Sequence, residues 1–230
     1  MKRKEFYKSI EKEFLTPQSP YIAYLLGFIW ADGHIEYNPK KFRRRVSIEI
    51  KRDDFLSLWG IINKFGGWRQ YFRARTLRNK VFEMGTARIS NKKIIEFLVS
   101  HGYTTKFSSP DSLIKVLPAE IRKYFFRGLF DGDGSFHFNK DRWATVFNIT
   151  GCFEQDWTFM ENLCKQLNVK YRISRRHSQG TKRSDIIINN VAEVVKISEF
   201  IFDGFESDRI GLYRKFEVFQ EIKQYFLNKV

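Results

Sequence analysis

Apolar residues recur at helical spacing in two stretches that lie about 101 residues apart, Leu25–Gly33 and Phe126–Gly134. In each stretch two small residues stand four positions apart on one helix face, and the stretch ends in Asp-Gly. The small residues are Gly27 and Ala31 in the first stretch, and Gly128 and Gly132 in the second. An acidic residue at the carboxyl end of a helix opposes the helix dipole at a cost of up to ~1 kcal/mol. The presence of an aspartate at this position in both stretches therefore indicates a functional role.

The similarity of the two halves continues beyond these helices. Val46–Glu49 corresponds to Phe147–Thr150 at the same offset, and the helically spaced apolar residues that follow match with one residue of drift. A duplicated unit of this length predicts two pseudo-symmetric subdomains. We expect them at residues 1–101 and 119–230, joined by a linker at 102–118 that contains Pro110 and Pro118.

Each unit is predicted to run helix, hairpin, helix, hairpin, helix, which makes the fold class α+β with two antiparallel sheets. The first unit is expected to contain helix Tyr21–Ala31, strands His34–Asn38 and Arg43–Lys51, helix Asp53–Phe65 capped by Asp53 or Asp54, strands Trp68–Arg75 and Lys80–Ile89, and helix Lys92–Ser100. The second is expected to contain a helix from Ala119 or Glu120, strands Ser135–Phe138 and Trp143–Thr150, helix Gln155–Leu167, strands Lys170–Arg175 and Lys182–Ile188, and helices Val191–Phe202 and Arg209–Tyr225.

The composition of the chain indicates the kind of partner that it binds. The chain is 43% hydrophobic and 17% aromatic, which excludes disorder, and its net charge of +15 indicates a polyanionic partner. No apolar run reaches the ~18 residues of a membrane span, and the basic N-terminus does not lead into the apolar core of a secretion signal. Nucleic acid inside the cell is therefore favoured over a membrane surface. The two cysteines, Cys152 and Cys164, form no CxxC pair, so neither a zinc site nor a disulfide framework is predicted.

The basic residues concentrate on predicted strands. Strand Arg43–Lys51 alternates, with Val46, Ile48 and Ile50 on one face and polar residues on the other, as in a sheet that packs on helices and meets a polar partner. Two such sheets would form a positive saddle that neutralises phosphates and offers polar side chains to base edges. The alternative is a solvated face on which Lys and Arg serve only solubility. The candidate DNA-binding residues are Glu36, Asn38, Arg43, Arg45, Ser47, Glu49, Lys51, Arg69, Tyr71, Arg73, Arg75, His137, Asn139, Asn148, Arg172, Arg175, Arg176, Lys182 and Arg183.

The aspartates at the ends of the two helices are the candidate catalytic residues. If the helices pack through their small residues, Asp32 and Asp133 come close together at the same end. Two neighbouring carboxylates repel each other unless a proton or cation lies between them, and hard oxygen ligands suit Mg²⁺. A metal held there could activate water for phosphodiester hydrolysis, with one site for each strand of a duplex. The alternative for either residue alone is a polar helix terminus with glycine as a left-handed stop.

The two Asp-Gly stretches resemble the motifs of the LAGLIDADG homing endonucleases, and the resemblance extends from about Tyr21 to Phe219. It implies a repeated αββαββα unit, motif helices at the interface and curved sheets over DNA. It also implies that Asp32 and Asp133 bind a divalent metal, Mg²⁺ or another hard cation such as Mn²⁺ or Ca²⁺.

Two lysines are carried over from the same resemblance as auxiliary catalytic residues. The segment Gly102–Phe107 is similar to the family's G-x-x-x-K stretch, which assigns Lys106, and Leu212–Phe216 is similar to its closing L-x-R-K segment, which assigns Lys215. For both, the alternative is a plain surface or phosphate contact.

The chain departs from the family pattern at two motif positions. Trp30 replaces the first motif Asp, whereas the second motif keeps Asp131, which is expected to pack or cap the helix. Arg127 replaces a small residue, which is compatible with the motif if its side chain points away from the interface.

The resemblance implies a monomeric, free-standing, intron-encoded enzyme that cuts both strands of double-stranded DNA at a long target. A LAGLIDADG-fold RNA maturase or transcription regulator that binds without cutting is the main alternative. A basic structural nucleoid protein is a more distant one. Because both motif acids are present, cleavage is the favoured interpretation.

Overall fold

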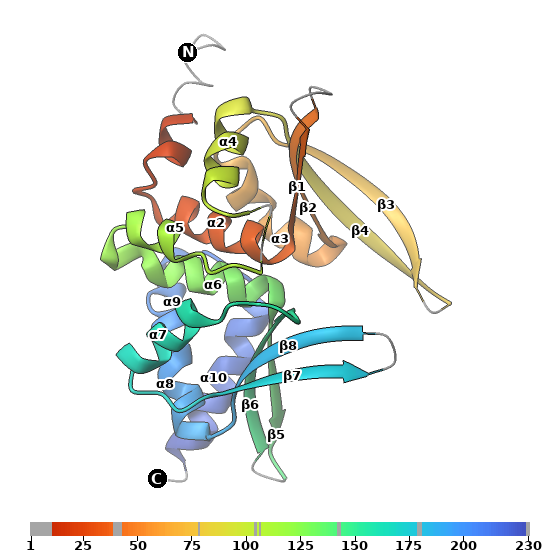
Figure 1. The fold of residues 1–230 in the computed structure, drawn as a ribbon. Coiled ribbons are helices and arrows are strands. Elements are labelled where there is room, and N and C mark those ends of the chain that lie inside the picture. Colours follow the sequence, from red (N-terminus) through yellow and green to blue (C-terminus); the bar gives the residue numbers. More distant parts are fainter. Residues whose placement is uncertain are drawn as a thin grey trace.

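Two similar halves stack through a central pair of helices in the computed structural model of the protein (Figure 1). The structure describes residues 11–38, 43–77, 79–103, 105, 107–141, 144–178 and 181–228. Each half contains one four-stranded antiparallel sheet, ordered β1-β2-β4-β3 in the first and β5-β6-β8-β7 in the second. The predicted α+β class, the duplicated units and the two antiparallel sheets are confirmed.

The first half follows the predicted order closely. Its elements are α2 (Pro20–Asp32), β1 (Gly33–Asn38), β2 (Arg43–Lys51), α3 (Arg52–Asn63), β3 (Arg69–Leu77), β4 (Lys80–Ile89) and α4 (Lys92–Ser100). Ser19 caps α2 by accepting a hydrogen bond from the Tyr21 N–H, and Asn91 caps α4. The predicted cap of α3 is wrong, because its N-cap residue is Lys51, which makes no side-chain capping bond.

The second half repeats this order with additional helices. Its elements are α5 (Asp111–Val116), the short 3₁₀ helix η2 (Ala119–Ile121), α6 (Arg122–Asp133), β5 (Gly134–Asn139), β6 (Ala144–Cys152), α7 (Thr158–Gln166), β7 (Arg172–Ser178), β8 (Thr181–Ile188), α8 (Val191–Phe202), α9 (Phe205–Asp208) and α10 (Tyr213–Leu227). Helix α5 lies in the segment that the sequence analysis treats as a linker. The predicted start of the last helix at Arg209 is wrong, because Arg209 and Gly211 have φ angles of 52° and 134° and interrupt the helix.

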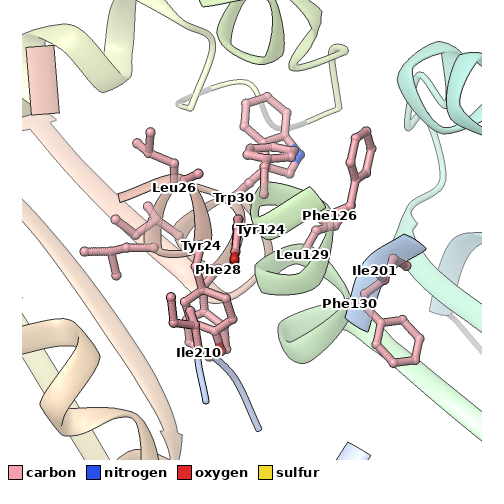
Figure 2. Close-up of a cluster of buried hydrophobic side chains, with 14 of the residues drawn as sticks. Tyr24, Leu26, Phe28, Trp30, Tyr124, Phe126, Leu129, Phe130, Ile201 and Ile210 are labelled. Atoms are coloured by element: carbon pink, nitrogen blue, oxygen red, sulfur yellow. The ribbon is translucent and has the colours of Figure 1, made fainter. Parts of the chain in front are cut away.

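Helices α2 and α6 pack through their glycines. A Cβ at Gly27 would overlap the carbonyl oxygen of Phe125, and a Cβ at Gly128 would overlap the carbonyl oxygen of Tyr24. Only glycine allows the two backbones to approach this closely, so the predicted small-residue contact is present. Aromatic and aliphatic side chains from both helices surround the contact (Figure 2). The labelled residues include Tyr24, Phe28 and Trp30 of α2, and Phe126, Leu129 and Phe130 of α6.

Each sheet packs one face on helices and leaves the other face open. In β2, the side chains of Val46, Ile48 and Ile50 are buried against α3 and α4, which confirms the predicted alternation. The second sheet packs on α6, α8 and α10. Hairpins β3–β4 and β7–β8 both project to the same side of the α2–α6 pair (Figure 1). Both hairpins and both carboxyl ends of the paired helices therefore belong to one side of the molecule.

Candidate functional site

The two motif aspartates are the last residues of their helices. Asp32 ends α2 and Asp133 ends α6, and the glycine that follows each of them is in an extended conformation. The left-handed glycine stop that the sequence allows is therefore not used. A Cβ at Gly132 of α6 would lie 3.2 Å from Asp32 Oδ2, so the Asp32 carboxylate lies directly beside the opposite motif.

Each aspartate lines its own cleft beside the helix pair. The Asp32 cleft, about 540 Å³, is lined at the end of β2 by Glu49, Ile50 and Lys51, and also by residues of the second half. The Asp133 cleft, about 260 Å³, is lined at the corresponding end of β6 by Thr150, Gly151 and Cys152. The site is thus a pseudo-symmetric pair of clefts, each bordered by one motif aspartate and by the end of a central strand.

Asp131 holds the two motif helices and the chain before α10 together. Its Oδ2 accepts hydrogen bonds from the Tyr24 hydroxyl of α2 and from the Leu212 N–H, both at 2.8 Å. Burial raises the pKa of the Asp131 carboxyl to about 6, although nearby Lys215 opposes this shift. Asp131 thus makes the packing contacts that the sequence predicts for it.

Lys215 caps the carboxyl end of α6. Its Nζ donates to the carbonyl oxygens of Phe130, Asp131 and Gly134 at 2.6, 2.8 and 2.7 Å, respectively. The side chain is buried, and this burial lowers the pKa of its ammonium to about 8. These bonds hold the backbone on both sides of Asp133 in place. Lys106, the other predicted auxiliary lysine, lies outside the described residues.

Replacing Lys215 by Met is expected to lower the free energy of unfolding by about 3 kcal/mol, because three buried carbonyls lose their charged donor. Urea unfolding measures the difference. Lys223→Met is the matched control, since Lys223 is a partly exposed lysine of the same helix that pairs with Glu199. Equal stability of the two variants would contradict a capping role for Lys215.

Arg127 is fully buried in the second half. It donates to the carbonyl oxygens of Ile201, Asp203 and Ile210, and its ion pair with Asp208 has an N–O distance of 3.0 Å. Its recorded bonds therefore go to the segment 201–210 and not to α2. This placement is compatible with the small-residue contact of the motif helices.

The open face of the first sheet gathers all of its candidate DNA-binding residues. The strand register puts Glu36, Asn38, Arg43, Arg45, Ser47, Glu49, Lys51, Arg69, Tyr71, Arg73 and Arg75 on this face, although the Arg43 side chain lies outside the described part. Several of the cations are paired: Glu36 lies 2.7 Å from Arg45, and Glu49 lies 2.6 Å from Arg73. The hydrogen bond from Arg73 is the main cause of the lowered pKa of Glu49. This face is thus an ordered array of charge pairs and less uniformly cationic than the sequence suggests.

The open face of the second sheet contains most of the corresponding residues. His137, Asn139, Asn148, Arg172, Arg176 and Arg183 share this face by register. Arg175 and Lys182 lie on the opposite face, where Arg175 donates to the carbonyl oxygen of Phe153 at 3.1 Å. The alternation along β7 therefore separates cations that the sequence analysis groups together.

One further basic residue of the first open face, Arg88, was not recognised from the sequence. Lys80 and Arg88 share the register face of Arg69 and Arg73, and the Arg88 guanidinium lies 5.2 Å from the centre of the Tyr71 ring. The alternation within Lys80–Ile89, with Ala87 and Ile89 on the buried face, is the signal that could have found Arg88.

Comparison with solved structures identifies the fold. The I-WcaI homing endonuclease bound to its DNA recognition sequence is similar over 90% of this chain and 89% of its own, with a TM-score of 0.62 and 13% identity. The I-LtrWI LAGLIDADG homing endonuclease bound to target DNA is similar over 91% of both chains, with a TM-score of 0.57 and 16% identity. A mutant of I-SmaMI is similar over 92% of both chains, with a TM-score of 0.53 and 16% identity.

This chain has the LAGLIDADG homing endonuclease fold. No protein-family model matches its sequence, and no curated protein does. The similarity is therefore one of fold at low sequence identity, and it spans both halves of the chain. Within this LAGLIDADG fold, the described residues include no helix long and apolar enough to cross a membrane.

Proposed function

We propose that the protein is a site-specific DNA endonuclease of the homing type, which makes double-strand breaks at a long target. The observation that carries the proposal is the pair of matched aspartates at the ends of two closely packed helices, each beside its own cleft and between two polar sheet faces. Two reactive positions on one side of the molecule fit the two strands of one duplex.

The donor set fits a hard divalent cation such as Mg²⁺. Asp32 and Asp133 would hold it, since carboxylate oxygens are ligands that Mg²⁺ prefers. Among the described residues, no group of three His, Cys, Asp or Glu side chains could enclose a metal by itself. Water and phosphate oxygens of the nucleic acid would then complete the coordination, as is usual for Mg²⁺. The metal would supply an activated water and charge stabilisation at the phosphate.

The chain's own residues would bind and orient the DNA. Arginines of both open faces neutralise phosphates, and the polar residues between them, such as Ser47 and Asn148, offer donors and acceptors to base edges. Glu49 keeps Arg73 in a defined orientation. Hydrolysis adds water at phosphorus and breaks the bond to the 3′-oxygen, which leaves as a hydroxyl, once in each cleft.

We further propose that one chain is sufficient for activity, as a monomer, since each half supplies one aspartate and the two halves together form both clefts. In this proposal residues 1–101 and 119–230 are the two subdomains, 102–118 joins them, and the protein is encoded in an intron. The principal alternative function uses the same two faces to bind RNA or a regulatory DNA site without cutting.

Cleavage of a randomised duplex library, followed by sequencing of the ends, tests the proposal. We expect one enriched long site that is cut with Mg²⁺ and remains intact with EDTA. Enrichment by binding without cutting, under several divalent metals, would overturn the nuclease proposal in favour of a maturase or regulator. RNA would then be the next ligand to test.

DNA affinity is expected to fall by about 10³-fold or more between 50 and 200 mM salt, because binding through many phosphates releases condensed counterions. Fluorescence anisotropy with a labelled duplex measures this dependence. Arg73→Gln should reduce the slope of log affinity against log salt by about one. Lys165→Gln, a change at an exposed position of α7, should leave it unaltered. A flat salt dependence would contradict phosphate binding by these faces.

A further inference from the structure

The two clefts differ in charge. Of the described residues that line the smaller cleft, Asp133 alone is charged. The Asp32 cleft is lined by several carboxylates and by two cations, Lys51 and Arg214. Arg214 belongs to the second half, so the cleft of the first motif aspartate contains a cation from the other half of the chain.

Arg214 is held by an ion pair that joins the two halves. Its Nε and Nη2 donate to Oδ1 and Oδ2 of Asp54, both at 2.7 Å. Asp54 lies in the first turn of α3, where the helix dipole favours a carboxylate. The hydrogen bonds from Arg214 are also the main cause of the lowered pKa of Asp54. A two-bond contact of this kind fixes the plane of the guanidinium as well as its position.

The contact with Asp54 leaves part of the guanidinium for another acceptor. Arginine has five N–H donors, and the bonds to Asp54 use those of Nε and one of Nη2. The remaining protons of Nη1 and Nη2 form the second edge of the fork, which matches two phosphate oxygens. The side chain is 57% exposed, so this edge can meet a ligand while Asp54 stays bound.

The neighbouring lysine cannot do the same without leaving its place. An ammonium has three N–H donors, and Lys215 makes three bonds to carbonyl oxygens at the end of α6. It is buried and is not among the residues that line the Asp32 cleft. Of these two adjacent cations, Arg214 is therefore the one that a phosphate in this cleft can reach.

We propose that Arg214 binds the phosphate that is cleaved beside Asp32, with Asp54 as the positioning residue that orients its guanidinium. The proposal rests on the proposed function and adds a strand assignment to it. Arg214 acts on the strand in the Asp32 cleft and not on the strand in the Asp133 cleft.

Strand-resolved cleavage tests this assignment, with each strand of the target duplex labelled separately. Arg214→Gln is expected to slow one strand about tenfold or more, to leave the other within about twofold, and to accumulate a nicked duplex. The slowed strand should be the one left uncut by Asp32→Asn. Arg214→Lys, which retains the charge without the fork, should restore part of the lost rate. Lys223→Gln removes a charge from the same helix and should cut like the wild type.

The positioning role of Asp54 has its own signature. Asp54→Asn should slow the same strand about threefold, and the double variant should be no slower than Arg214→Gln alone, since Asp54 acts through Arg214. Equal slowing of both strands, or weaker DNA binding without strand bias, would overturn the proposal and leave Arg214 as a structural link between α10 and α3. A wild-type protein that cuts neither strand would instead overturn the proposed endonuclease function.

Discussion

Asp133→Asn is expected to abolish double-strand cutting, with a loss in rate of at least about a hundredfold on the strand that it serves, and Asp32→Asn is expected to do the same for the other strand. The change removes a negative charge and a hard oxygen donor while it preserves the shape of the side chain. Metal-assisted hydrolysis draws several kcal/mol of transition-state stabilisation from the metal site, and each 1.4 kcal/mol is tenfold in rate. DNA binding should remain largely intact, because the cations of the open faces are unchanged. Cleavage of a labelled target, with binding measured in parallel, gives both quantities.

Asp203→Asn is the matched control for these variants. Asp203 follows α8, is exposed and pairs with Lys123, away from both clefts. It should cut both strands like the wild type. An Asp32→Asn or Asp133→Asn protein that still cuts both strands at the wild-type rate would remove these residues from the candidate site.

Gly27→Ala is expected to lower the free energy of unfolding by about 2 to 3 kcal/mol, even though alanine is the better helix former by about 1 kcal/mol. The added methyl group would overlap the Phe125 carbonyl, and a backbone atom cannot move aside as a flexible side chain can. The paired helices must therefore separate or rotate, which also displaces Asp32 relative to Gly132. Denaturant unfolding measures the loss, and cutting should decline with it.

Gly60→Ala is expected to change the free energy of unfolding in the opposite direction. Gly60 lies within α3, is exposed, and a Cβ there would meet no atom within 4 Å. Alanine at this position should raise the free energy of unfolding by about 0.5 to 1 kcal/mol through helix propensity alone. If both substitutions stabilise the protein, α2 and α6 do not approach each other closely enough to require glycine at position 27.

Local patterns predicted most of the fold because they recur in both halves. Strand β4 and helices α4 and α8 have the predicted bounds, since alternation and helical spacing each leave a clear periodic signal. The start of α10 was not predictable in this way. The apolar spacing continues back to Arg209, whereas the positive φ angles at Arg209 and Gly211 depend on their contacts in the folded chain.

The acidic residues of the candidate site could be predicted from the sequence, whereas the positions of its basic residues could be predicted only in part. Asp32 and Asp133 stand in repeated motifs, so their proximity follows from the packing of two similar helices. The three carbonyl bonds of Lys215 and the pairing of Arg214 with Asp54 are long-range contacts that no local pattern encodes. The face on which Arg175 lies depends on the register between β7 and β8. A shift of this register by one residue would move every side chain of the strand to the other face.

The two open faces present the same chemistry in reversed order at one pair of equivalent positions. In the first sheet, Glu49 on β2 faces Thr86 on β4, and in the second, Thr150 on β6 faces Asp185 on β8. A carboxylate and a hydroxyl have thus exchanged strands between halves that share one backbone plan. Thr86 and Asp185 are buried, so the partly exposed members of the two pairs are Glu49 and Thr150. If both faces contact one duplex as we propose, one half-site meets a carboxylate at this position and the other meets a hydroxyl. The preferred target is then not a palindrome, and a protein built from two copies of the first half would select a different, symmetric sequence.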